Sequence, residues 1–164
     1  LLGKTGTGPK IHSITTGKIV DFNTTDVFNM GAVMAPAAAD TILTHLKDTN
    51  QKPEDYDAII TGDLGQCGTD ILLDLTKQLG TDISAVHQDC GLLIFDNQAQ
   101  DTHAGGSGCG CSASLFSGYF YQQLKDKKLK KILLVPTGAL MSLCSTQQGD
   151  NITGIAHAVS IWCE

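Results

Sequence analysis

Short apolar runs that suit buried strands alternate along this chain with segments whose apolar residues recur at helical spacing. Ala58-Ile59-Ile60 is a run of the first kind, and the segment from Ile71 to Leu79, ended by Gly80, is of the second kind. The amphipathic stretch from Ser112 to Leu124 is followed by another strand-like run, Ile132 to Pro136. This alternation predicts an α/β fold in which a mixed sheet is flanked by helices and ligands bind at the carboxyl ends of the strands.

The same patterns predict the remaining elements. Ile11 to Val20 is expected to form a strand or hairpin, and a helix is expected from Pro36, with the proline in its first turn. Leu92 to Phe95 is a short strand candidate. Gln147 to Gly154 has the composition of a loop, and Ile155 to Trp162 is expected to form a final strand with His157 buried in it.

The length and net charge of the chain limit the classes of protein to which it can belong. A chain of 164 residues can bury one core, so we expect a tail or linker at 1–10 and one folded unit at 11–164. The net charge of -6 disfavours nucleic acid and anionic membrane surfaces as direct partners. No stretch approaches the roughly 20 apolar residues of a membrane span, so we expect a soluble intracellular chain. The missing initiator Met suggests a fragment of a longer protein.

The six cysteines do not form a metal-binding pattern. Cys109 and Cys111 are the one close pair, whereas the other four cysteines are scattered singly, and a structural zinc site needs a second pair. We therefore expect reduced thiols, no metal site and no cofactor.

A loop rich in glycine and cysteine runs from His103 to Ala113, and its segment Gly105 to Ser112, the glycine loop, directly precedes an expected helix. Its glycines permit close approach and positive φ, and backbone N–H groups at a helix start can bind an anion without a side-chain cation. That property matters because all eleven basic residues are Lys, so no arginine fork is available for a carboxylate. The alternative is a tight turn whose small residues only allow close packing against the sheet.

Several motifs carry a resemblance to a known family. They are Asn29 to Ile42, Asp55-Tyr56-Asp57, Thr61 to Leu64, Asp89 to Leu92, Ala104 to Ala113, Thr137 to Leu140 and Ile155-Ala156-His157. Together they resemble the C-terminal half of the thiolase and ketosynthase superfamily, and more closely the stage V sporulation protein AD family. The resemblance implies a thiolase-like C-terminal subdomain whose N-terminal half is absent.

The catalytic pattern of the superfamily is broken in this chain. The resemblance implies His or Asn after the second strand, His or Asn in the glycine loop, and in thiolases a Cys after the penultimate strand. The matching positions are Gly62 or Asp63, Ser107, and Pro136 or Thr137. These residues cannot supply the proton acceptor and oxyanion donors of a condensation, so we expect no catalytic residues and no enzymatic activity.

The sporulation family implies a binding role instead. Its ligand is dipicolinic acid, pyridine-2,6-dicarboxylate, taken up into the developing spore. Its expected setting is the forespore, peripheral at the inner membrane, as a homodimer with other stage V sporulation A proteins. An acyl-thioester condensing enzyme and a scaffold for spore membrane transport proteins remain the alternatives.

The candidate ligand-binding residues lie in and around the glycine loop. They are Gly62, Asp63, His87, His103, Gly106, Ser107, Gly108 and Cys109. His103 could donate to a carboxylate, although a solvent-facing turn explains it nearly as well, and His87 lies in what looks like an insertion near the site. Asp63 would repel a dianion unless it is protonated or turned away.

Overall fold

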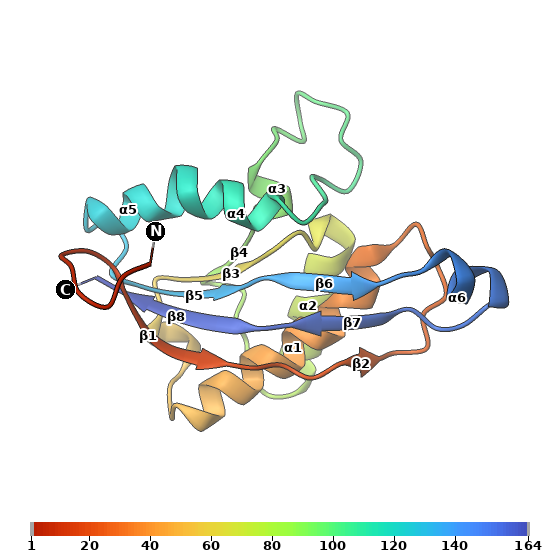
Figure 1. Cartoon of the computed structure of the whole chain (residues 1–164), viewed down its shortest axis with the longest axis horizontal. Helices are drawn as coiled ribbons and strands as arrows, with labels where there is room; N and C mark the ends of the chain where they lie inside the picture. Colours follow the sequence, from red (N-terminus) through yellow and green to blue (C-terminus); the bar gives the residue numbers. More distant parts are fainter. Residues whose placement is uncertain (1, 164) are drawn as a thin grey trace.

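A five-stranded mixed sheet forms the centre of the molecule in a computed structural model that describes residues 2–163 (Figure 1). Its strands, in spatial order, are β1 (Lys10–Thr15), β8 (Ala158–Trp162), β5 (Lys131–Val135), β3 (Ala58–Thr61) and β4 (His87–Asp89). β3 runs parallel to β4 and β5, whereas β8 runs antiparallel to β5 and β1. The predicted α/β class with a mixed sheet is confirmed.

A smaller three-stranded sheet continues from one end of the large one. It contains β2 (Val20–Asp21), β7 (Thr153–Ala156) and β6 (Thr137–Leu140), which prolong the paths of β1, β8 and β5 (Figure 1). The large and small sheets separate at Pro136, which has no backbone N–H to donate, and at His157, whose N–H donates to the Pro136 carbonyl at 3.3 Å. The single final strand predicted for Ile155 to Trp162 is therefore two strands.

Helices cover both faces of the large sheet (Figure 1). One layer holds α1 (Met30–Asp48) and α2 (Gly65–Gln78); the other holds α3 (Cys90–Leu93), α4 (Cys111–Leu115), η2 (Phe116–Phe120) and α5 (Tyr121–Lys125). α4, η2 and α5 follow one another without a break. Two short helices, η1 (Pro53–Asp55) and α6 (Leu143–Gln148), lie in connections.

Burial on both faces explains the continuous apolar run of β3. Ile59 packs with the α1 and α2 side chains, whereas Ala58 and Ile60 pack with Phe120 and Leu124 of the opposite layer. All five residues are fully buried. A strand with two buried faces has no polar alternation, as the sequence indicated.

Three predicted elements differ from the structure. The first helix begins at Met30 rather than at Pro36, because the Asn29 side chain accepts from the Ala32 N–H at 3.2 Å and caps the helix earlier. The strand predicted at Leu92–Phe95 is wrong, since Cys90–Leu93 is the helix α3. For Ile11–Val20 the strand alternative is confirmed by β1, and the hairpin alternative is wrong, because β1 pairs with β8 and β2 pairs with β7.

The buried histidine of the fold is His45 rather than His157. His157 is exposed, and its Nδ1 accepts from the Gly17 N–H at 3.1 Å. His45 is fully buried between the Thr15 hydroxyl, 2.7 Å from Nδ1, and the Tyr56 hydroxyl, 2.8 Å from Nε2. Burial lowers the pKa of His45, so the ring is neutral at pH 7.

No helix within residues 2–163 combines the length and the apolar character needed to cross a membrane.

Candidate functional site

The carboxyl ends of three parallel strands meet at one edge of the large sheet. Thr61 at the end of β3 pairs in register with Asp89 at the end of β4 and with Val135 at the end of β5. The residues that follow each strand are therefore neighbours, although 74 positions separate Asp63 from Thr137. Open α/β sheets bind ligands at this edge.

Asp89 organises the loop that follows β3. Its carboxylate is 2% exposed and accepts from the Thr61 hydroxyl at 2.6 Å and from the N–H groups of Leu64 and Gly65 at 3.0 Å each. Gly65 is the first residue of α2, so the carboxylate also lies at the positive end of that helix. These bonds fix the position of Asp63, which lies between Thr61 and Leu64 in the chain.

The glycine loop is held against this edge by close backbone contacts. The Gly106 N–H donates to the Gly91 carbonyl at 2.7 Å, and the Gln66 N–H donates to the Ala104 carbonyl at 2.7 Å. A Cβ on Gly91 would lie 2.5 Å from the Gly106 oxygen, so the approach requires glycine there. Gly105 takes a φ of +116°, which only glycine adopts readily.

Asp63 bridges the two sides of the site. Its Oδ2 accepts from the Gly108 N–H at 2.8 Å and from the Ser107 hydroxyl at 3.4 Å, and its Oδ1 accepts from the Thr137 hydroxyl at 3.2 Å. Burial raises the pKa of Asp63, and the nearby Asp89 charge raises it further, against the lowering effect of the three donors. The hydrogen bonds turn the Asp63 carboxyl toward the loop, and its raised pKa means that it takes up a proton more readily than a free aspartate does.

Three N–H groups of the glycine loop remain available. Within the part of the chain that the structure describes, the backbone N–H groups of Ser107, Cys109 and Gly110 donate to no acceptor. The residues that carry them are exposed. They precede the continuous helical run that begins at Cys111, and such a cluster of donors favours an anion.

The structure gathers five of the eight predicted ligand-binding residues. The Ser107 hydroxyl and the Gly108 N–H both donate to Asp63, Gly106 is anchored beside them, and a Cβ on Gly62 would lie 2.8 Å from the Thr137 hydroxyl. Gly62 and Gly106 have no side chain, so they allow the backbone segments of the site to pack closely but supply no side-chain group for binding.

The other three predicted residues lie apart from this cluster. The His103 side chain is 89% exposed and pairs with Asp101 at 3.4 Å, so it points away from the site as a turn histidine does. The His87 Nε2 lies 3.0 Å from the Thr61 hydroxyl, which donates to Asp89, so His87 reaches the site only through these two residues. Burial lowers the pKa of His87. Cys109 lies within the glycine loop, but its thiol is exposed and has no hydrogen bond to Asp63 in the described residues, so only its backbone N–H is available for binding.

The sequence analysis did not include Thr137 or Asp89 among the ligand-binding residues, although both lie within motifs quoted for the resemblance and Pro136 or Thr137 matched a catalytic position of the superfamily. Their importance depends on the register of the parallel strands, which no local pattern encodes. A polar residue at or just after each strand end was the available signal.

The thiols next to the site are not activated. Burial raises the pKa of Cys90 to about 12 and also raises the pKa of Cys111. Both thiols are buried in the core under α4. Among residues 2–163, no group of three His, Cys, Asp or Glu side chains is arranged to hold a metal ion.

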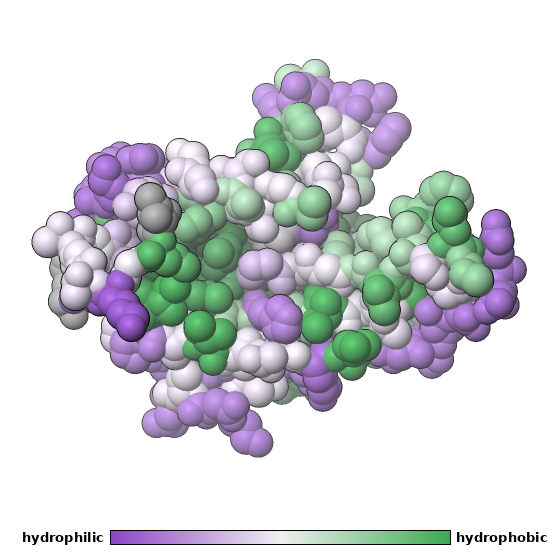
Figure 2. Space-filling model, in the orientation of Figure 1, coloured by the Kyte–Doolittle hydropathy of each residue, from purple (hydrophilic) through white to green (hydrophobic). Residues whose placement is uncertain are grey.

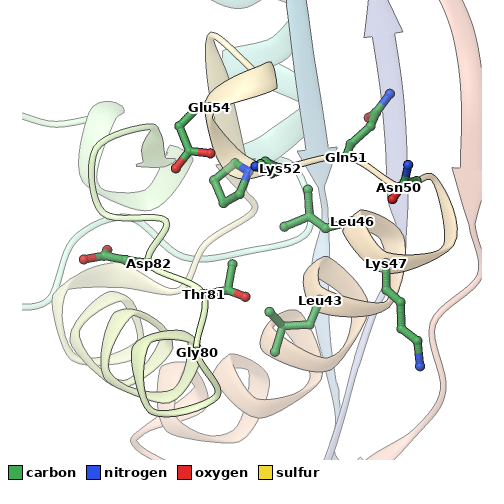
Figure 3. A pocket seen from close by; sticks show the side chains of 11 residues that line it. Leu43, Leu46, Lys47, Asn50, Gln51, Lys52, Glu54, Gly80, Thr81 and Asp82 are labelled. Carbon is green, nitrogen blue, oxygen red and sulfur yellow. The ribbon is translucent and has the colours of Figure 1, made fainter.

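A separate cleft lies at the opposite end of β3 (Figure 3). Leu43 and Leu46 of α1 form one side, and Gly80, Thr81 and Asp82 face them after α2. The cleft lies near η1, which precedes β3, whereas the glycine loop lies where β3 ends. It shares no residue with the Asp63 cluster.

Comparison with known proteins identifies a family and a similar solved structure. A family model described as Stage V sporulation protein AD matches residues 1–162. The chain is 47% identical over 150 residues to the Stage V sporulation protein AD of Bacillus subtilis (strain 168), covering 92% of this chain and 44% of that protein. The chain thus spans less than half the length of this relative.

Among solved structures, the chain is similar to 3-oxoacyl-[acyl-carrier-protein] synthase III from Aquifex aeolicus VF5. The TM-score is 0.45 at 13% identity, over 97% of this chain and 54% of that one. A score this low does not establish a shared fold.

Proposed function

Because the chain belongs to the stage V sporulation protein AD family, we propose that its glycine loop forms part of a non-catalytic site for dipicolinic acid. In this proposal the whole protein serves the uptake of dipicolinic acid into the developing spore. The ligand is a small planar dianion at neutral pH, so its site must supply hydrogen-bond donors and little negative charge.

The free N–H groups of Ser107, Cys109 and Gly110 are the observation that carries this proposal. Three donors next to a helix start can bind the oxygens of one carboxylate without a guanidinium group. This arrangement suits a chain that contains no arginine. Two carboxylates need further donors, which we assign to the rest of the full-length protein.

Asp63 must not repel a negatively charged ligand, and its surroundings favour a carboxyl that can take up a proton. Its carboxyl faces the Gly108 N–H and the Thr137 hydroxyl, and burial raises its pKa. A proton on Asp63 would remove the repulsion and turn the carboxyl into a donor for the ligand. Affinity should therefore rise as the pH falls toward the pKa of Asp63, as long as the ligand stays ionised.

The absence of catalysis is part of the proposal. The positions that the resemblance matches to catalytic ones hold Gly62 or Asp63, Ser107, and Pro136 or Thr137. Among these residues, the Ser107 and Thr137 hydroxyls both donate to the Asp63 carboxylate. Such a group lacks the histidine that would take a proton from a thioester substrate. The buried Cys90 thiol, with its raised pKa, is a poor nucleophile.

Two alternatives predict different results. A condensing enzyme of the ketosynthase or thiolase type would turn over acyl thioesters as full-length protein, and we expect no such turnover. A scaffold for spore membrane transport proteins would keep its partners after the glycine loop is altered. Exposed apolar residues such as Phe28 and Leu143, 95% and 85% exposed, favour protein contacts, so we propose homodimer and stage V sporulation A contacts alongside ligand binding.

Calorimetric titration of the full-length protein with dipicolinic acid tests the binding site. We expect saturable heat at pH 7, its loss in Ser107→Trp because the indole covers the free N–H groups, and no loss in Ser117→Trp. Ser117 is another exposed serine, and it lies in η2. The proposal fails if the wild-type protein gives no saturable heat, or if Ser107→Trp binds as the wild type does.

A further inference from the structure

A partly exposed aromatic ring lies against the glycine loop. Phe95 is 43% exposed and follows α3 at the base of the long connection to α4 (Figure 1). The Phe95 carbons nearest to an ideal Cβ on Gly106 would be 3.2 and 3.3 Å away. The ring edge is therefore in contact range of the Gly106 backbone, one residue before the free N–H of Ser107.

The position of this ring is fixed by its neighbours. The Ile94 N–H donates to the Cys90 carbonyl at 3.1 Å, and the Gly106 N–H donates to the Gly91 carbonyl at 2.7 Å. A Cβ on Gly106 would lie 2.4 Å from an Ile94 methyl carbon, so a side chain there would displace Ile94. The absence of a Cβ at Gly106 lets the aromatic ring approach the loop.

Covering Gly106 does not require an aromatic residue at position 95. Ile94 already contacts the same glycine, and 43% of Phe95 remains in water. An open aromatic surface beside unpaired N–H donors matches a planar aromatic acid, whose carboxylate meets the donors while its ring packs on the phenyl group. An aliphatic acid of equal charge would gain only the first of these contacts.

We infer that Phe95 is a specificity-determining residue, which makes the site select aromatic dicarboxylates over aliphatic ones; this inference rests on the proposed function. Phe95 contributes ring contact, and the N–H groups of Ser107, Cys109 and Gly110 contribute the recognition of charge. Two separate parts of the same site then recognise the charge and the aromatic ring of the ligand. Figure 2 shows apolar surface at the base of the long connection, beside its polar tip.

The test compares two dianions on the full-length protein by titration calorimetry, with competition for weak binding. Pyridine-2,6-dicarboxylate and glutarate both place three atoms between their carboxylates, but only the first is aromatic. Phe95→Leu is expected to raise the Kd for the pyridine acid by about 3- to 10-fold and to leave the Kd for glutarate unchanged. Phe95→Tyr should restore the preference for the pyridine acid. Phe22→Leu, which changes a phenylalanine that is 55% exposed and follows β2, should alter neither Kd.

The outcomes separate the two claims. No binding of the pyridine acid by the wild-type protein refutes the proposed function and the inference with it. Binding that Phe95→Leu leaves unchanged, or weakens equally for both acids, refutes the inference alone, because an equal loss means that Phe95 only supports the loop. A wild-type protein that does not prefer the pyridine acid to glutarate also refutes the inference.

Discussion

Replacing Asp89 by asparagine tests whether one buried carboxylate holds the site together. The change keeps the shape of the side chain and alters one oxygen. Oδ1 can still accept from the Thr61 hydroxyl and the Leu64 N–H, but an amide group in place of Oδ2 would meet the Gly65 N–H, 3.0 Å away. Two donors would then face each other at a position that is 2% exposed.

The cost follows from these contacts. A buried donor left without a partner costs about 1–3 kcal/mol, and two hydrogen bonds weakened from charged to neutral cost roughly 1 kcal/mol each. Removing a buried charge returns part of its desolvation cost, so we expect Asp89→Asn to lower the free energy of unfolding by about 2–4 kcal/mol.

Urea denaturation followed by circular dichroism at pH 7 measures this change. Asp82→Asn is the matched control, because the Asp82 carboxylate is exposed and accepts from the Ser84 N–H at 2.9 Å and from the Ser84 hydroxyl, and we expect a loss under about 1 kcal/mol there. If Asp89→Asn destabilises no more than Asp82→Asn, the reasoning about the site's organisation is refuted.

Other predictions concern the layer around the site. Thr69→Val should stabilise the protein by about 1 kcal/mol, since its buried hydroxyl has no partner among the described residues. Thr41→Val should cost about 1–2 kcal/mol because it removes the buried hydrogen bond of 3.0 Å from the Thr41 hydroxyl to the Ala156 carbonyl. Urea titrations that give both changes the same sign contradict this pair of predictions. Burial lowers the pKa of His45, so the neutral ring stabilises the fold above pH 6.5, and this stabilisation is lost as the pH falls through the folded-state pKa. The free energies of unfolding at pH 7 and pH 5 should therefore differ less in His45→Gln than in the wild type. An equal difference in the two proteins refutes the assignment. Gly31→Ala should lower the melting temperature by several degrees, because its Cβ would lie 2.3 Å from the Leu64 oxygen; an unchanged melting temperature would contradict that close contact.

The fold was predictable where the sequence pattern is local. β3 and β5 are apolar on both faces, so their runs stand out, and the continuous helix from Cys111 follows its amphipathic spacing. β4 was missed because His87-Gln88-Asp89 carries no apolar signal and becomes a strand only by pairing with β3. The apolar Leu92–Phe95 run covers the glycine loop rather than entering the sheet.

The residues of the glycine loop were easier to predict from the sequence than the residues that contact the loop. Glycine density before a helix start identified Gly106 to Gly108, because a local backbone requirement leaves a local signature. Thr137 was missed since it comes near Asp63 only through strand register. His103 was included for its nearness in sequence, but a φ of +51° accompanies a turn that leaves its side chain in water.

A crystal structure of the full-length protein with dipicolinic acid bound tests the central claim most directly. The account predicts a ligand carboxylate within hydrogen-bond distance of the N–H groups of Ser107, Cys109 and Gly110, with the Asp63 carboxyl protonated or turned from the ligand. A ligand bound elsewhere, with these N–H groups in contact with solvent alone, would contradict it.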